Sequence, residues 1–190
     1  MISTPLFTGQ NLILTPFNIE KDAQAVSNWS YDLTVARQFG RNPARPMNEA
    51  SAKKVLEDHT RKPENTAFFA FGIRIKDKKK LVGILRLRYI AWNHGAGEID
   101  VIFGNPEHRQ QCGSEALAMG LVYAFEELNL HRLNTRAIGE NEQDAISLFE
   151  TAGFTLEIRQ REALFNSGRF WDGLIFGLFR SEWLERQEAH

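Results

Sequence analysis

Residues 97–120 read GEIDVIFGNPEHRQQCGSEALAMG, and a change of periodicity inside this stretch decides the fold. Apolar residues first alternate with polar ones, at Ile99, Val101 and Phe103. This alternation predicts a strand over 97–103. After a polar loop around Gly104-Asn105-Pro106, apolar residues recur at helical spacing, at Leu117, Leu121, Ala124 and Leu128. We therefore expect a strand, a polar loop and then an amphipathic helix over about 113–129.

Two more strands precede this stretch. Residues 66–76 alternate apolar and small or polar side chains, and 81–90 form a matching apolar run. The charged segment Asp77-Lys78-Lys79-Lys80 separates the two runs and predicts the turn between them. With 97–103, these strands are expected to form an antiparallel meander.

The first sixty residues predict one strand and two helices. Residues 11–17 form the strand, and Asn18 is placed to cap a helix over about 20–29. The segment 37–48 contains Gly and Pro and is expected to be a loop. A second helix is expected over about 48–61.

The last sixty residues predict a strand, a helix and a hairpin. The strand covers 133–138, and the helix covers 142–152. Two runs over 154–165 and 169–180 turn at Asn166-Ser167-Gly168. Helices therefore alternate with groups of strands, which predicts an α/β fold with a mixed, mostly antiparallel central sheet flanked by helices.

Composition narrows the class of protein. The chain has 190 residues, 43% hydrophobic and 25% charged, with a formal net charge of -1. This balance is typical of one soluble globular domain over 1–190 and argues against nucleic-acid binding by bulk charge. A lone cysteine, Cys112, makes an internal disulfide impossible, and no Cys/His spacing predicts a metal site. No signal-peptide pattern and no long apolar run occur, so we expect a cytoplasmic protein that does not enter membranes.

The expected helix start after the polar loop could bind an anion. A helix N-terminus offers unpartnered main-chain N–H groups and the positive end of the helix dipole, which together favour phosphate. His108, Arg109 and Gln110 would add donors around it. The alternative is an ordinary loop before a helix that Gly113 or Ser114 caps.

Other stretches share motifs with a known family. Residues 145–154 read AISLFETAGF, and 168–178 read GRFWDGLIFGL. Taken with 97–120, and in this order from Leu12 to Trp183, they resemble the GNAT superfamily of acyl-CoA-dependent N-acetyltransferases. The closing strand is similar to that of the ribosomal-protein and polyamine N-acetyltransferase subgroup.

The resemblance implies a GNAT-like domain that uses acetyl-CoA as co-substrate, with no metal. The pantetheine arm would pair with the strand at Val101, Ile102 and Phe103, and a main-chain N–H at Val101 or Ile102 would polarise the thioester carbonyl. The pyrophosphate would lie against the segment His108, Arg109, Gln110, Gln111, Cys112, Gly113 and Ser114. Asn141 and Phe149 would also lie near the cofactor.

The chain departs from the family pattern in the phosphate signature, Arg/Gln-x-x-Gly-x-Gly/Ala. In one register its two small-residue positions hold Cys112 and Ser114, and in the other Gln111 and Gly113. In either register, one of the two positions has a larger residue than expected. A glycine at such a position lets the main chain approach the phosphates.

Two more departures affect the proposed site. Many family members have tyrosine where this chain has Phe149, and phenylalanine cannot protonate the leaving thiolate. Its helical spacing favours a role as a core aromatic residue. Asn141 stands one residue further from Ala145 than in the family, and a turn or helix cap is the alternative to a cofactor contact.

Glu98 and Asp100 are the candidate catalytic residues. They alternate with apolar residues on the strand 97–103 and so share one face. An amine must lose a proton before it attacks a thioester, and a carboxylate could accept that proton directly or through water. The alternative is that the two acids form salt bridges with Arg86 or Arg88 on the neighbouring strand.

Cys112 could be reactive if it lay at the helix start, because a helix N-terminus lowers the pKa of a thiol. The alternative is a small apolar residue. The function that the resemblance implies is acetyl transfer to a primary amine, either a protein N-terminus, a polyamine or another small amine. A non-catalytic acyl-CoA-binding protein on the same scaffold is the alternative, and a homodimer is left open.

Overall fold

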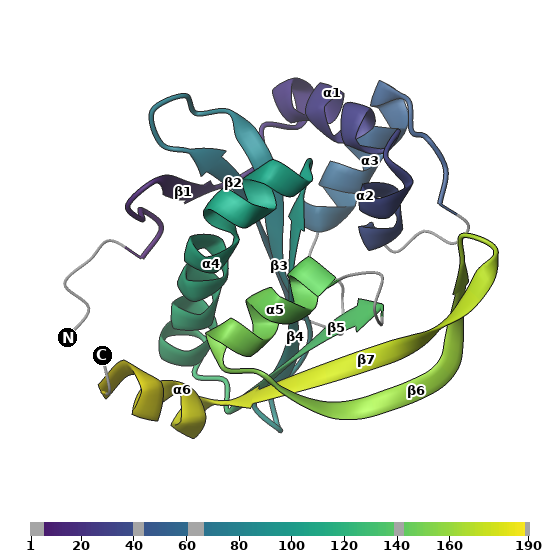
Figure 1. Ribbon diagram of the computed structural model, residues 1–190. Coiled ribbons are helices and arrows are strands. Elements are labelled where there is room, and N and C mark those ends of the chain that lie inside the picture. The colour runs from purple at the N-terminus through teal and green to yellow at the C-terminus, as the bar shows by residue number, and fades with distance from the viewer. Residues whose placement is uncertain (1–5, 40–43, 61–66, 139–142, 189–190) are drawn as a thin grey trace.

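The computed structural model describes residues 6–39, 44–60, 67–138 and 143–188, and in them one seven-stranded sheet has helices on both faces (Figure 1). The strand order is β1-β2-β3-β4-β5-β7-β6. The strands are β1 Leu12–Thr15, β2 Ala67–Ile75, β3 Leu81–Ala91, β4 Ala96–Phe103, β5 Arg132–Ile138, β6 Thr155–Asn166 and β7 Arg169–Phe179. The pair β4–β5 is parallel and the other neighbouring pairs are antiparallel. The predicted mixed, mostly antiparallel sheet is thus confirmed.

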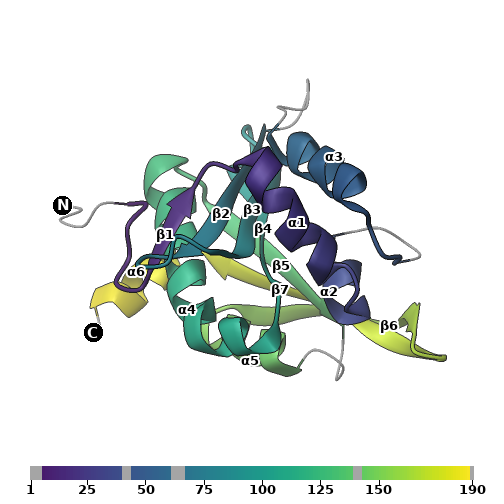
Figure 2. The same ribbon diagram turned by 90° about the horizontal axis from the view of Figure 1, so that it is seen from above.

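The helices form one layer on each face of the sheet (Figure 2). The first layer is α1 Ile19–Trp29, α2 Leu33–Gln38 and α3 Glu49–Thr60. The second is α4 Pro106–Val122, its π-helical continuation Tyr123–Glu127, and α5 Gln143–Ala152, while α6 Arg180–Glu188 follows β7. Successive residues of β4 face opposite helix layers: Ile102 packs with α1–α3, and Phe103 packs with α4 and α5.

The central meander and the last hairpin follow the predicted pattern. In β3 and β4, Leu85 lies opposite Val101 and Arg86 lies opposite Asp100. The hairpin turns through Ser167 at φ 51° and Gly168 at φ 81°. Two successive positive φ angles are those of the tight turn that matches strand twist.

Helix α4 begins much earlier than the sequence pattern predicted. Asn105 caps it, and its side-chain oxygen accepts a 2.8 Å hydrogen bond from the main-chain N–H of His108. Pro106 occupies the first helical position, where a missing N–H costs nothing. The predicted polar loop up to residue 112 is therefore wrong, because the Asn-Pro pair starts the helix.

The sequence pattern did not predict two of the helices, α2 and α6. Asp32 caps the short α2 by accepting from the main-chain N–H of Thr34 at 2.7 Å. In α6, Trp183 is buried against Phe125, with ring centroids 5.4 Å apart. The described buried residues of these helices are few, Val35 and Ala36 in α2 and Trp183 in α6, so neither shows an apolar stripe, and tertiary packing holds them instead.

No helix within the described ranges is both long enough and apolar enough to cross a membrane. The same ranges contain no group of three or more His, Cys, Asp or Glu side chains that could hold a metal ion.

Candidate active site

The strands β4 and β5 separate part way along the sheet. They pair from Ala96–Arg132 to Glu98–Asn134, and no further pair joins these two strands, which the structure describes in full. Beyond that point β4 keeps only its β3 neighbour, and β5 keeps only β7. The β4 edge over 99–103 therefore offers main-chain donors and acceptors that no strand satisfies.

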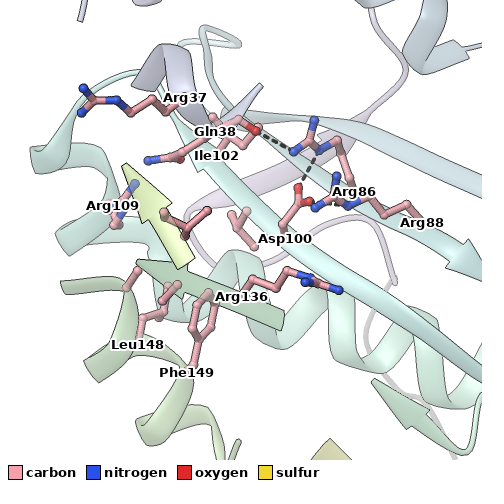
Figure 3. A pocket seen from close by; sticks show the side chains of 14 residues that line it. Arg37, Gln38, Arg86, Arg88, Asp100, Ile102, Arg109, Arg136, Leu148 and Phe149 are labelled. Carbon is pink, nitrogen blue, oxygen red and sulfur yellow. Dashed lines mark hydrogen bonds and ion pairs between the residues drawn. The ribbon is translucent and has the colours of Figure 1, made fainter. Parts of the chain in front are cut away.

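A pocket of about 210 Å³ opens where the two strands part (Figure 3). It draws side chains from both helix layers and from the long hairpin. The lining residues are Arg37, Gln38, Arg86, Arg88, Asp100, Val101, Ile102, Arg109, Arg136, Ala137, Ala145, Leu148, Phe149 and Leu164. The pocket therefore connects one face of the sheet with the other.

The side of the pocket formed by α5 is apolar. Leu148 and Phe149 project from α5 toward the gap, next to Val101 and Ala137 of the separated strands. Phe149 is 5% exposed and packs on Phe154, with ring centroids 5.9 Å apart. Phe149 is thus a core aromatic residue, as its spacing predicted, and also part of the pocket wall.

Asp100 lies between two arginines. Its Oδ1 accepts a 2.6 Å hydrogen bond from Nε of Arg86. Its Oδ2 lies 3.0 Å from Nε of Arg88, at an angle that makes no hydrogen bond, so this oxygen is a buried acceptor without a donor. A buried, unsatisfied carboxylate oxygen in a pocket is a place where a ligand donor would be stabilised.

Glu98 is also paired with two arginines. Its Oε1 accepts from Nε and Nη2 of Arg136 at 3.0 and 2.8 Å, and its Oε2 lies 3.5 Å from Nη2 of Arg88. Glu98 stands behind the pocket wall rather than in it. The predicted alternative of salt-bridged acids is confirmed for both residues, and a part in proton transfer stays a prediction.

Arg86 is held from three sides. Besides Asp100, it donates to the main-chain oxygen of Gln38 at 2.9 Å and lies 3.2 Å from Nε2 of His59. Because a guanidinium can only donate, Nε2 of His59 must accept. Burial, followed by the charge of Arg86, lowers the pKa of His59 to about 4, so the imidazole is neutral.

A second cavity, of about 220 Å³, lies between α4 and α5. Arg109, Gln110 and Ser114 line it from α4, and Asp144, Ser147 and Thr151 line it from α5. Arg109 also reaches the pocket between β4 and β5, so the two cavities meet at this side chain. Gly113 lets the helices approach, since a Cβ there would lie 3.3 Å from Cδ2 of Leu148.

The earlier helix start changes how this segment could bind phosphate. From Arg109 onward the amides lie inside α4, where they bond to the preceding turn. Only side chains, chiefly Arg109, Gln110 and Ser114, present donors to the cavity. The expected cradle of main-chain N–H groups is therefore absent over 109–114.

The other predicted cofactor residues lie outside these cavities. Phe103 and Cys112 are buried in the core, His108 is half-buried and Gln111 is exposed. Helix α4 starts at Pro106, so Cys112 lies inside the helix and not at its start, and burial raises the pKa of its thiol. This placement fits the alternative of a small apolar residue. Asn141 lies outside the described residues.

Several pocket residues carry no signal in the sequence that predicts their place in the pocket. Arg37 belongs to the unpredicted α2, and nothing in its local sequence marks it. Arg136 and Leu164 lie on strands that were predicted, but their place in the pocket depends on strand neighbours distant in sequence. The pattern of β5 could have placed Arg136 on one face, yet without showing which residues it meets.

A comparison with protein-family models matches residues 11–155 to the family described as "Acetyltransferase (GNAT) domain". The spermidine N(1)-acetyltransferase of Vibrio cholerae serotype O1 is 32% identical over 112 residues, which are 58% of this chain. Those residues span 64% of that relative, which is less than two thirds of its length.

Two longer matches agree with the family model. The uncharacterized N-acetyltransferase YoaA of Bacillus subtilis is 24% identical over 179 residues, covering 93% of this chain and 97% of that protein. The crystal structure of spermidine N-acetyltransferase from Vibrio cholerae, in complex with CoA and spermine, has a similar fold with a TM-score of 0.76. It is 24% identical and covers 93% of this chain and 99% of that chain.

Proposed function

This chain belongs to the GNAT acetyltransferase family, and on that basis we propose that it transfers the acetyl group of acetyl-CoA to a primary amine in the pocket between β4 and β5. One observation carries the proposal: the two strands part after Glu98 and Asn134. The parted strands leave an open main-chain edge beside a pocket with an apolar wall and a charged wall. The apolar wall suits the arm that carries the thioester, and the charged wall suits the amine.

Acetyl-CoA would enter from the side of α4 and α5. The pantetheine arm would pair with the free edge of β4 at Val101, Ile102 and Phe103, and its apolar parts would contact Leu148 and Phe149. The phosphates would lie toward Arg109, held by guanidinium and other side-chain donors instead of main-chain amides.

The reaction would be a direct attack in a ternary complex. The neutral amine nitrogen attacks the thioester carbon, a C–N bond forms, the C–S bond breaks, and CoA leaves as a thiolate. A main-chain N–H at Val101 or Ile102 would stabilise the negative charge on the carbonyl oxygen. Holding both reactants in one pocket removes most of the entropic barrier.

Asp100 is better placed than Glu98 to accept the amine proton. Asp100 lines the pocket and Glu98 does not, and Oδ2 of Asp100 accepts no hydrogen bond although it lies 3.0 Å from Nε of Arg88. We therefore propose Asp100 as the group that receives the proton and Glu98 as a residue that positions Arg88 and Arg136. In steady-state kinetics, Asp100→Asn should flatten the acidic limb of the pH–rate profile, while Glu98→Gln should mainly change KM. The reverse result would exchange the two roles.

The leaving thiolate would be protonated by water. The chain has three tyrosines, all of them described, and none lines the pocket. An alkyl thiol has a free pKa of about 8.5, so a thiolate can leave at neutral pH without a side-chain acid. We further propose that the enzyme is cytoplasmic, assembles as a homo-oligomer and binds no nucleic acid.

Release of CoA across a panel of primary amines tests the function. The panel should include a peptide N-terminus, polyamines, simple alkylamines and amino acids, and mass spectrometry should identify the acetylated amine. Calorimetry with acetyl-CoA separates an enzyme from a binding protein. Tight binding without amine-dependent release of CoA would favour the non-catalytic alternative, and no binding would refute acetyl-CoA as the ligand.

A further inference from the structure

The two faces of the pocket differ in charge. Arg86 contacts α2 and α3 through the oxygen of Gln38 and the ring of His59, so it lies on the α1–α3 face of the sheet. Asp100 pairs with Arg86 and therefore lies on the same face. The opposite face presents Leu148 and Phe149. If acetyl-CoA lies along the apolar face, as proposed above, the acceptor amine meets the charged one.

Positive charge exceeds negative charge on the acceptor face. Four arginines from α2, β3 and β5 stand there with two carboxylates: Arg37, Arg86, Arg88 and Arg136 with Glu98 and Asp100. Both carboxylates are already paired with two guanidinium groups. Among the described residues Arg37 has no carboxylate partner.

Asp100 and the neighbouring guanidinium groups together offer a hydrogen-bond acceptor and hydrogen-bond donors. Oδ2 of Asp100 and Nε of Arg88 form an ion pair at 3.0 Å, but both are buried and neither makes a hydrogen bond. The side chain of Arg136 is 56% exposed and retains an Nη1 that makes no hydrogen bond to Glu98. An ammonium would satisfy Oδ2, and a neighbouring carboxylate would satisfy the guanidinium groups.

We propose that the acceptor is a primary amine that carries its own carboxylate beside the amino group, as a free α-amino acid does. The proposal rests on the proposed acetyl transfer. The amino group meets Asp100, and the carboxylate meets the guanidinium groups of Arg88 and Arg136, whereas Arg37 points toward the other end of the pocket (Figure 3). A polyamine brings only positive charge to a face that already has an excess of it, and like charges repel strongly in a partly buried cavity.

Matched substrates test this selectivity. Free amino acids are compared with their amino-acid amides, which keep the amine and the side chain and lose only the negative charge, and with spermidine. The expected kcat/KM is about tenfold or more higher for at least one free amino acid than for its amide. Spermidine should be a poorer acceptor than that amino acid.

Matched variants test the residues. Arg136→Gln should lower the ratio of kcat/KM for amino acid over amide, while Arg136→Lys should restore most of it. The ratio cancels effects on the acetyl-CoA site or on folding. Arg132→Gln is the control, because Arg132 lies on the same strand and face as Arg136 but outside the pocket. It should leave the ratio unchanged.

Each outcome separates this inference from the proposed function. Preference for the free amino acid, lost in Arg136→Gln, supports both. Equal or faster acetylation of the amides or of spermidine overturns the inference and leaves amine acetylation standing. A ratio that Arg136→Gln leaves unchanged overturns the role of Arg136 and with it the carboxylate subsite. Acetylation of no amine at all overturns both proposals.

Discussion

Arg86 and Asp100 face each other across β3 and β4, with Nε of the arginine 2.6 Å from Oδ1 of the aspartate. The arginine side chain is 5% exposed, and it is also bound to α2 and α3. The ion pair thus connects the pocket to the first helix layer. Since a buried charge is costly without its partner, the two residues depend on each other.

Asp100→Asn should therefore destabilise the fold. The change keeps the shape of the side chain but leaves Arg86 with uncompensated charge, which we expect to cost about 3 kcal/mol of unfolding free energy. Urea unfolding measures this cost. The control is Glu157→Gln, which breaks the more exposed pair with Arg132 and should cost about 1 kcal/mol or less. Equal losses in the two variants would contradict a special role for the buried pair.

Stability should fall in acid because of His59. Its pKa is about 4 in the folded chain against 6.5 for a free imidazole, so below pH 6.5 the unfolded state takes up a proton that the folded state does not. The free energy of unfolding should thus decrease from about pH 6.5 down to pH 4, by about 3 kcal/mol for this group.

His59→Gln keeps a hydrogen-bond acceptor for Arg86 but cannot titrate in this range. The variant should lose this part of the pH dependence in urea titrations at several pH values. His94→Gln is the control, because His94 is exposed. An unchanged slope in His59→Gln would mean that the imidazole is not held neutral by folding.

Arg109→Ala should weaken acetyl-CoA binding. The guanidinium stands where the two cavities meet, and a charge-assisted bond to phosphate contributes about 1–3 kcal/mol. Calorimetry at low salt measures the dissociation constant, with Lys54→Ala on the exposed side of α3 as the control. An unchanged constant in Arg109→Ala would remove this residue from the phosphate site.

Phe149→Tyr should raise kcat on a good amine and leave acetyl-CoA affinity almost unchanged. The ring lines the pocket, so a hydroxyl there could protonate the leaving thiolate. Phe154→Tyr is the control, since Phe154 is buried beside Phe149 but outside the pocket. Its hydroxyl should cost about 1–3 kcal/mol of stability and bring no kinetic gain. The same result for Phe149→Tyr would make Phe149 a packing residue only.

Local patterns predicted most of the fold. The meander, the two longer helices of the first layer and the last hairpin follow from periodicity and turn residues. The start of α4 was also encoded locally, in Asn105 and Pro106, but the polar side chains up to Gln111 suggested a loop. Those side chains form the first turns of α4, where they are exposed or half-buried, so their polarity carries no information about where the helix begins.

The pocket depends on relationships that a single sequence does not contain. The acids and their arginine partners on β3 could be anticipated from alternation on adjacent antiparallel strands. Arg136 and Arg37 could not, because their places depend on the parallel pairing of β4 with β5 and on a helix of six residues. The charge of the acceptor face therefore emerged only from the tertiary structure.

The central claim is that acetyl transfer takes place in the pocket where β4 and β5 part. Ala145 lies half-buried in its wall, and Ala145→Trp would fill the space with an indole. Single-turnover acetylation of the best amine should fall by about 10²-fold or more in this variant, with acetyl-CoA affinity reduced as well. Ala50→Trp, at an exposed position of α3, should behave like the unaltered protein. Full activity of a folded Ala145→Trp protein would contradict the claim.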